Sequence, residues 1–361
     1  MNTRLLIASA ALVLAAGANA QTTQRFTASK ANEYGLTYSL PATVLNITVE
    51  TEHAATTPGE FYNYARRHLA INDAVTAPSS TVKVKSVTVT TSGVADNSNR
   101  WMVQFKNGAP LYMLLTDDGT PLTLNTEQLA ADDAPELPVA VARRPTILET
   151  DAARQAMTQD MIRSSSTSKR AELAAQRIFE LRDMRSDLLS GQLDNPPADG
   201  QAMQLMLDNI ANQEAALTAM FSGTTSSWTE VKTITLRPDT TDIDNMVIAR
   251  ISPVDGIINA DNLAGAPLSL SLTVTERGTL PVTDRGEEKR FPKGGVAYTI
   301  PGTAHLSISF EGREIASTDV TLAQLGVTFG IDPALFTDKK APARLIFDPA
   351  TGAIRLFGPA E

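Results

Sequence analysis

Apolar residues at steps of three and four positions mark the middle of this 361-residue chain. Between residues 164 and 223 the steps keep one face of a 3.6-residue helix apolar, on both sides of a turn rich in proline and glycine. Gly191 suits the left-handed residue past a helix end, and Pro196-Pro197 cannot continue a helix. A short connection makes two helices antiparallel neighbours, so the pattern predicts a long helical hairpin.

The apolar stripe of this hairpin needs a cover, because two helices alone have little core. Two interpretations stay open. The stripe is packed against the rest of the chain, or the hairpin is a projecting arm that pairs with a partner or a second copy. Methionines in the stripe would give an adaptable contact surface. The candidate partner face consists of the apolar residues Ile178, Leu181, Met184, Leu188, Met203, Leu207, Ile210 and Leu217.

Alternation of apolar and polar residues predicts strands on both sides of the hairpin. The expected strands before it cover residues 43–50, 81–90, 101–105, 111–115 and 121–124. Those after it cover residues 231–236, 246–251, 268–274, 296–300, 304–310, 314–320, 343–347 and 353–357. The strands and the hairpin together indicate an α+β protein.

A short helix and a linker interrupt this pattern. Thr57, Pro58 and Glu60 have the spacing of a helix N-cap with a capping box, which predicts a helix from Thr57 to near Asn72. Residues 126–146 are rich in alanine, proline and acids, which is typical of a linker.

The two β-regions resemble each other. Gly35-Leu-Thr-Tyr38-Ser-Leu-Pro41-Ala-Thr43 aligns with Gly295-Val-Ala-Tyr298-Thr-Ile-Pro301-Gly-Thr303, and Asp118-Gly119 matches Asp348 and Gly352 later in the same order. The alternative is chance recurrence of strand and turn residues. We expect two β-sandwich-like domains, related by an internal duplication, that flank the hairpin. The expected segments are a signal peptide (1–20), an N-terminal β-domain (21–125), a linker (126–148), the hairpin (149–224) and a C-terminal β-domain (225–361).

The first twenty residues have the pattern of a secretory signal peptide. Arg4 precedes a short apolar run, and Ala18-Asn19-Ala20 is a small-x-small cleavage site. The apolar run is shorter than the roughly 20 residues that span a bilayer, so we expect no membrane span. The chain has no cysteine, which excludes a lipoprotein anchor, disulfides and thiolate metal sites. These features predict an exported protein, periplasmic or associated with the outer membrane.

Charge and composition restrict the partners. The net charge is −9 without a basic cluster, which argues against nucleic acid and anionic lipid surfaces. Aromatic residues are only 5% of the chain, which weakens a carbohydrate-binding interpretation, because sugar sites stack on exposed rings.

No motif predicts a reaction, a cofactor or a metal. His53, His68 and His305 have no metal-ligand spacing, and surface or structural roles suit each of them better. Ser166-Thr-Ser-Lys169 matches a Ser-x-x-Lys pattern, but it precedes a helix, where serine is a cap. Asp242-Ile-Asp244 lacks the remaining ligands of a calcium loop. We therefore name no catalytic residue.

The chain resembles an exported Bacteroidota family catalogued only as domain of unknown function 4831. The resemblance implies an exported envelope protein, and it supplies no activity. The matching segments, in order, are Tyr38-Ser-Leu-Pro41-Ala-Thr43, Thr57-Pro58-Gly59-Glu60-Phe61, Leu115-Thr-Asp-Asp-Gly119, Ser166-Thr-Ser-Lys169, residues 171–176, Gly191-Gln192 through Asp199-Gly200, Phe221-Ser-Gly-Thr224 and Leu263-Ala-Gly-Ala-Pro267.

The leading expectation is a non-enzymatic scaffold or interaction module in a periplasmic or outer-membrane complex, with an envelope protein or a second copy bound at the hairpin. One alternative is a module that binds a glycan or peptide, for which a deep pocket lined by Trp101 or Trp228 would speak. The other is a hydrolase, for which carboxylates or histidines would have to converge in one cleft near His53 or His305.

Overall fold

The computed structural model describes residues 6–7, 22–25, 35–104, 112–129, 135–192, 200–336 and 343–359. Most of the expected signal peptide and the Pro196-Pro197 turn lie outside these residues. The fold is mixed, with several sheets and a group of helices, which confirms the α+β expectation at this level.

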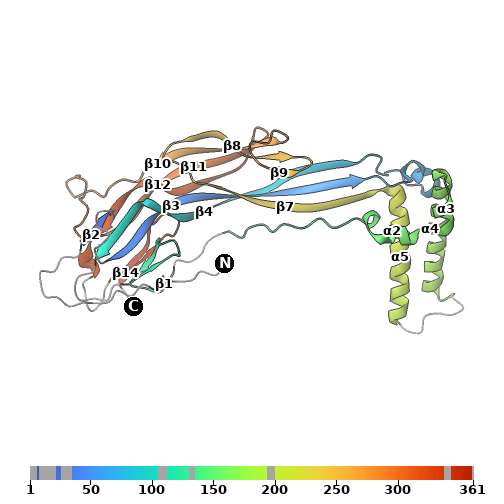
Figure 1. The fold of residues 1–361 in the computed structure, drawn as a ribbon, viewed down its shortest axis with the longest axis horizontal. Helices are drawn as coiled ribbons and strands as arrows, with labels where there is room; N and C mark the ends of the chain where they lie inside the picture. The colour runs from blue at the N-terminus through green and yellow to red at the C-terminus, as the bar shows by residue number, and fades with distance from the viewer. Residues whose placement is uncertain are drawn as a thin grey trace.

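The molecule is elongated and contains three sheets, with a helical unit at one end (Figure 1). The shaft sheet has the strand order β2-β4-β3-β7, and its three long strands lead to the helices. Its members are β2 (Thr22–Arg25), β3 (Leu36–Thr57), β4 (Ser79–Gln104) and β7 (Thr224–Leu236).

Two more sheets lie toward the other end of the molecule. The covering sheet has the order β12-β11-β10-β8-β9 and contains β8 (Ile243–Ser252), β9 (Gly256–Ile258), β10 (Ala266–Glu276), β11 (Val296–Phe310) and β12 (Arg313–Ile331). The end sheet has the order β1-β5-β6-β13-β14 and contains β1 (Leu6–Ile7), β5 (Met113–Leu115), β6 (Pro121–Leu124), β13 (Ala343–Phe347) and β14 (Ile354–Pro359). A 3-10 turn, η4 (Pro333–Phe336), follows β12.

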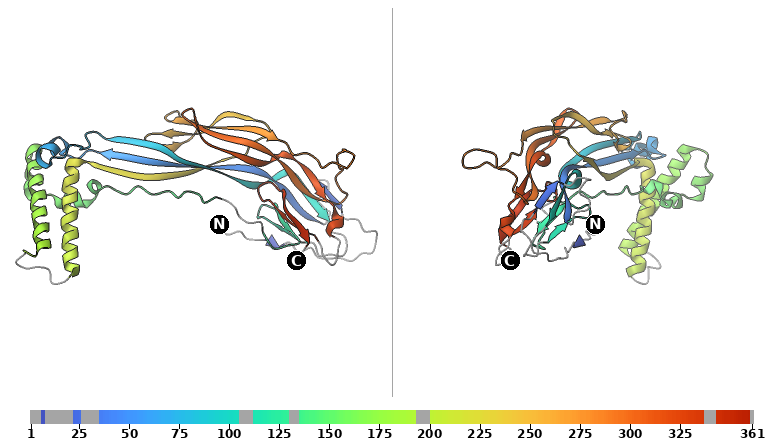
Figure 2. Two further views of the ribbon diagram at one scale, coloured as in Figure 1. Left: turned by 180° about the vertical axis from the view of Figure 1, so that it is seen from behind. Right: turned by 60° about the vertical axis from the view of Figure 1, so that its left-hand side comes forward.

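The helical unit stands at the far end of the shaft sheet, with its two longest helices turned across the strand direction (Figure 2). These are α4 (Thr167–Ser190) and α5 (Gly200–Ser222). The short elements beside them are η2 (Tyr62–Tyr64), α1 (Ala65–Leu69), η3 (Ile147–Glu149), α2 (Asp151–Ala156) and α3 (Gln159–Arg163). Gly191 ends α4 in the left-handed conformation, with φ of 70°, as its position predicted.

The sheets do not divide where we expected two separate β-domains to lie. Strand β3 pairs with β7 in unbroken antiparallel register, from Leu45 opposite Leu236 to Thr57 opposite Thr224. Strand β6 pairs with β13, with Leu124 opposite Leu345. The reason is topological, because the helices return the chain to the point where β3 ended, and β7 then satisfies the backbone groups along that strand.

The expected helix from Thr57 to Asn72 is wrong at its start. Thr57 is the last residue of β3, so it pairs in the sheet and does not cap a helix. The helix itself is the short α1, which ends at Leu69, and Ala70 follows with φ of 56°. Sheet pairing with Thr224 uses the backbone that the capping box would need.

Two expected pairs of strands are single long strands. Residues 81–90 and 101–105 fall largely within β4, and residues 296–300 and 304–310 form β11. The register shifts by a bulge in each repeat, between Ser39 and Pro41 in β3 and between Ile300 and Gly302 in β11. Pro41 and Pro301 thus lie at irregular points of the ladder, as expected of residues without an N–H donor.

The aligned segments of the two β-regions also share a hydrogen bond. The Ser39 amide donates to the carbonyl of Gly119 at 2.9 Å, and the Thr299 amide donates to the carbonyl of Gly352 at 3.1 Å. Ser39 aligns with Thr299, and Gly119 aligns with Gly352. Equivalent strands, β3 and β11, therefore meet equivalent turns in the two β-regions, as the expected duplication would produce.

The principal β-core lies between the shaft sheet and the covering sheet. Alternate residues of β3 point into it, and Leu45, Ile47 and Val49 are fully buried there. They share this core with residues of β8, β10, β11 and β12, such as Leu270 and Leu306. The period of two along each strand follows from the pleat, and it gives the shaft sheet one fixed face.

Candidate functional site

The structure buries most of the predicted partner face within the chain. Five of its eight side chains are at most 9% exposed, and Met184, Met203 and Leu207 are half-buried. Ile178 and Leu217 are completely covered. Together with Ala65 of α1, Ala153 of α2 and Met161 of α3, these residues form the apolar core of the helical unit. A buried side chain cannot meet a partner while the unit stays folded.

An open groove remains between α4 and α5, where the two helices extend past their short neighbours (Figure 1). Its volume is about 370 Å³. Most of the side chains that line it are apolar: Leu181, Met184, Leu188, Leu205, Met206 and Ile210, with Arg177, Asn209 and Gln213 at its polar positions. Leu205 is 71% exposed, and Met206 is 44% exposed. Neither Leu205 nor Met206 belongs to the predicted partner face.

Ion pairs join the two helices beside this groove. The Arg182 guanidinium lies 2.7 Å from the Glu214 carboxylate, and Arg185 lies 3.9 Å from it. Arg182 also lies over the ring of Phe179, at 5.7 Å from its centroid. Exposed pairs of this kind add little stability, but they favour one alignment of α4 on α5.

His53 lies in a polar cluster of the shaft sheet. It is 4% exposed and stacks on Trp228, with ring centroids 4.9 Å apart. Its Nε2 lies 3.2 Å from both Thr51 Oγ1 and Glu230 Oε2. A hydroxyl–imidazole–carboxylate relay uses one ring nitrogen for each partner. Both contacts of His53 use the same nitrogen, so this cluster does not have relay geometry.

The other two histidines lie elsewhere. His305 is on β11 and pairs with Asp319 at 2.7 Å, with half of its side chain exposed. His68 is on α1 beside Tyr64. No group of three metal-ligating side chains occurs among the described residues. Asp242 accepts a hydrogen bond from the Val274 amide at 2.8 Å, which accounts for it without calcium.

The two tryptophans pack on other rings. Trp101 stacks on Phe291 with centroids 5.3 Å apart, and Trp228 lies between His53 and the Arg143 guanidinium. Neither lines the groove between α4 and α5 or the slot described next. Ser166, the first residue of the Ser-x-x-Lys match, accepts a hydrogen bond from the Lys169 amide and caps α4.

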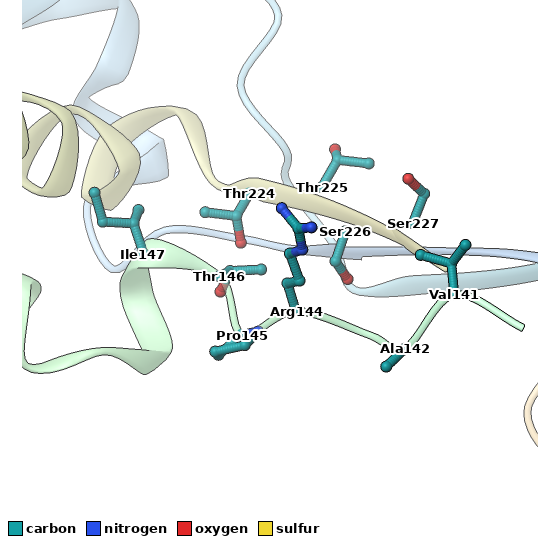
Figure 3. A pocket seen from close by; sticks show the side chains of 10 residues that line it. All are labelled: Val141, Ala142, Arg144, Pro145, Thr146, Ile147, Thr224, Thr225, Ser226 and Ser227. Atoms are coloured by element: carbon teal, nitrogen blue, oxygen red, sulfur yellow. The ribbon is translucent and has the colours of Figure 1, made fainter. Parts of the chain in front are cut away.

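A second opening, the slot, lies between the linker and the start of β7 (Figure 3). Its volume is about 550 Å³. Figure 3 shows the Arg144 side chain rising from the linker toward the strand. The slot is lined by Val141, Ala142, Arg144, Pro145, Thr146, Ile147, Thr224, Thr225, Ser226 and Ser227.

One backbone bridge joins the linker to β7 among the described residues. Val141 and Thr229 exchange two backbone hydrogen bonds of 3.1 Å in an antiparallel bridge. Arg143 adds a side-chain contact between the linker and β7, because its guanidinium lies over the ring of Trp228. The same guanidinium donates a hydrogen bond of 2.8 Å to Glu149. Sequence reasoning found the linker but had no signal for this bridge, since it joins positions 88 residues apart.

No described helix is long and apolar enough to cross a bilayer. Neither a curated protein nor a solved structure matches the chain. One family model, described as a domain of unknown function (DUF4831), matches residues 34–355. Because this match takes in both β-regions and the helical unit between them, the chain belongs to the DUF4831 family.

Proposed function

We propose that the protein is an exported, non-enzymatic interaction module of the cell envelope of a Bacteroidota bacterium, and that it receives an amphipathic helix of a partner protein in the groove between α4 and α5. The observation that carries this proposal is the groove itself. Apolar side chains line it, and it lies at the end of a long shaft, away from the two other sheets.

The groove has the properties that helix recognition needs. An amphipathic helix buries apolar side chains at steps of three and four residues in such a groove. Met184 and Met206 adapt to different partner side chains, and the ion pairs of Glu214 hold the two walls in place. The parts of α4 and α5 that line the groove extend past α1, α2 and α3 (Figure 1), so a helix can approach without displacing these short helices.

Export rests on the signal-like start and on the absence of cysteine. A periplasmic location, free or in an outer-membrane complex, fits both features. Fractionation of the producing cells tests this part separately, and recovery of the chain with its first twenty residues intact in the cytosol would contradict it.

An affinity capture experiment tests the interaction. Tagged protein without residues 1–20 is mixed with an envelope extract of the producing cells, and bound proteins are identified by mass spectrometry. We expect a partner that Leu205→Asp and Met206→Asp each fail to retain, because both side chains are exposed in the groove. Leu263→Asp is the matched control, since Leu263 is 79% exposed and lies in the connection between β9 and β10, outside the groove. Equal capture by all variants, or none by the wild type, would rule the groove out.

Self-association is a distinct outcome of the same design. Sedimentation of the purified protein alone would then show a dimer that Leu205→Asp dissociates. With such a result, the helix bound in the groove would be α5 of a second copy and not a helix of a different protein.

A further inference from the structure

We propose that the slot between the linker and β7 binds an extended peptide with an acidic side chain, which adds as a strand to the free edge of β7. This site is separate from the groove between α4 and α5 and does not rest on the function proposed for that groove.

The outer edge of β7 presents backbone groups that face away from β3. Strand β7 pairs with β3 on one side only, in register without a shift. Thr229 turns its N–H and C=O away from β3, because both bond to Val141. Backbone direction alternates along an antiparallel strand, so Thr225 and Ser227 also turn theirs outward. Within the described part of the chain, these outward groups have no hydrogen-bond partner.

The linker pairs with this edge at Val141 and then leaves it. An antiparallel continuation would place Arg143 opposite Ser227 and Pro145 opposite Thr225, but neither backbone pair forms among the described residues. Pro145 could not donate to the ladder at Thr225, because proline has no N–H. The slot opens where the linker departs, and an incoming strand would have β7 on one side and the linker on the other (Figure 3).

The side chains around the slot indicate the charge of the occupant. Arg144 forms no ion pair within the described residues, whereas its neighbour Arg143 bonds Glu149. Thr224 Oγ1 is buried and has no hydrogen-bond partner there. A guanidinium recognises a carboxylate with charge-assisted hydrogen bonds. An acidic side chain of the peptide would therefore pair with Arg144, while its backbone pairs with Thr225 and Ser227.

The dimensions suit a short segment. Two outward-facing residues of one edge pair with about four residues of an added strand, or roughly 13 Å at 3.3 Å per residue. The volume of about 550 Å³ is in the range of ordinary ligand sites. Recognition by strand addition takes its affinity from main-chain hydrogen bonds and its specificity from flanking side chains.

The test uses the full mature chain and a phage-displayed library of random octapeptides. An enriched peptide is synthesised with a fluorescein label, and its affinity is measured by fluorescence anisotropy. We expect enriched sequences with β-branched residues and at least one acid. Arg144→Gln and Ser227→Pro should each weaken the binding about tenfold, which corresponds to the loss of one good interaction.

Two matched variants keep the outcome specific. Arg154→Gln removes an exposed arginine of α2 outside the slot, and Thr235→Pro removes an outward N–H farther along the edge of β7. Both should leave the affinity unchanged, as should Leu205→Asp in the groove. The proposal is overturned if no peptide is enriched, if Arg144→Gln and Ser227→Pro bind as the wild type does, or if free glutamate competes as well as the peptide.

Discussion

The hydroxyl of Tyr38 accepts a hydrogen bond of 2.8 Å from the amide of Ala297 and donates one of 3.2 Å to its carbonyl. The two residues are 259 positions apart, and they join β3 of the shaft sheet to β11 of the covering sheet. Tyr38 is 2% exposed. One side chain thereby satisfies both backbone groups of a buried residue in the other β-region.

Tyr38→Phe should destabilise the protein by about 1–3 kcal/mol, because it leaves buried groups of Ala297 unsatisfied. Urea unfolding followed by circular dichroism measures this change. Tyr62→Phe is the matched control, since Tyr62 is only half-buried, in the short turn before α1. Equal stability of both variants would show that the Ala297 contacts contribute nothing.

Tyr38 should also make stability fall at alkaline pH. Burial raises the pKa of this phenol well above its ordinary value, so the folded state keeps the proton after the unfolded state has lost it. The stabilisation is complete below a pH of about 10, the ordinary value for tyrosine, and is lost as the pH rises beyond it. Unfolding curves from pH 9 to 11 should be steeper in pH for the wild type than for Tyr38→Phe.

Glu50 should make the stability of the protein fall at acidic pH, whereas Tyr38 makes it fall at alkaline pH. Hydrogen bonds from Lys85, at 2.8 Å, and from Ser86 hold the pKa of its carboxyl below the ordinary value. The stability from this group is therefore present above the unfolded pKa of about 4.3 and is lost as the pH falls through the folded pKa. Glu50→Gln should lower stability at pH 7 and flatten the acid limb of a plot of unfolding free energy against pH. An unchanged acid limb would contradict this pairing of Glu50 with Lys85 and Ser86.

The aligned turns of the two β-regions should respond differently to the same substitution. Gly119 and Gly352 have φ of 86° and 72°, so alanine at either position costs about 1–2 kcal/mol of backbone strain. Nothing lies near a Cβ at Gly119, but a Cβ at Gly352 would come within 2.8 Å of the Pro41 ring. Gly352→Ala should therefore lower the unfolding temperature more than Gly119→Ala. The reverse order would contradict the packing of Pro41 on this turn.

Local patterns predicted the helices better than the sheets. The spacing of Ile178 and Leu181 and the left-handed glycine at residue 191 are local signals, and α4 has the extent that they indicate. The pairing of β3 with β7 joins strands about 180 residues apart, which no local pattern encodes. Thr57 shows how long-range pairing overrides a local signal. The sequence motif predicts a helix N-cap at this residue, but Thr57 is the last residue of strand β3.

The candidate sites depended on long-range packing as well. The apolar stripe of the helices was visible in the sequence, but its coverage by α2 and α3 was not. The open part of the groove begins where those short helices end, and this makes Leu205 exposed while Leu217, on the same helix, is buried. The slot depends on the single bridge between Val141 and Thr229, for which neither residue type is a signal.

Substitutions at Leu205 and Ile178 should distinguish an exposed contact residue from a core residue by their effect on stability. Leu205→Asp should change the free energy of unfolding by less than about 0.5 kcal/mol, since surface substitutions away from packed sites are nearly neutral. Ile178→Asp should cost about 3 kcal/mol or more, because it buries a charge without a partner. Thermal unfolding of the two variants measures both values, and similar losses would place Leu205 in the core too.

Site-specific photo-crosslinking shows whether the groove between α4 and α5 contacts a partner in the cell. A benzoylphenylalanine replaces Leu205 in the groove or Thr235 on the exposed edge of the shaft, and the producing cells are irradiated. We expect a covalent adduct of defined mass from position 205 and none from position 235. Adducts from position 235 alone, or no adduct from position 205, would contradict the proposal that the groove between α4 and α5 receives a partner.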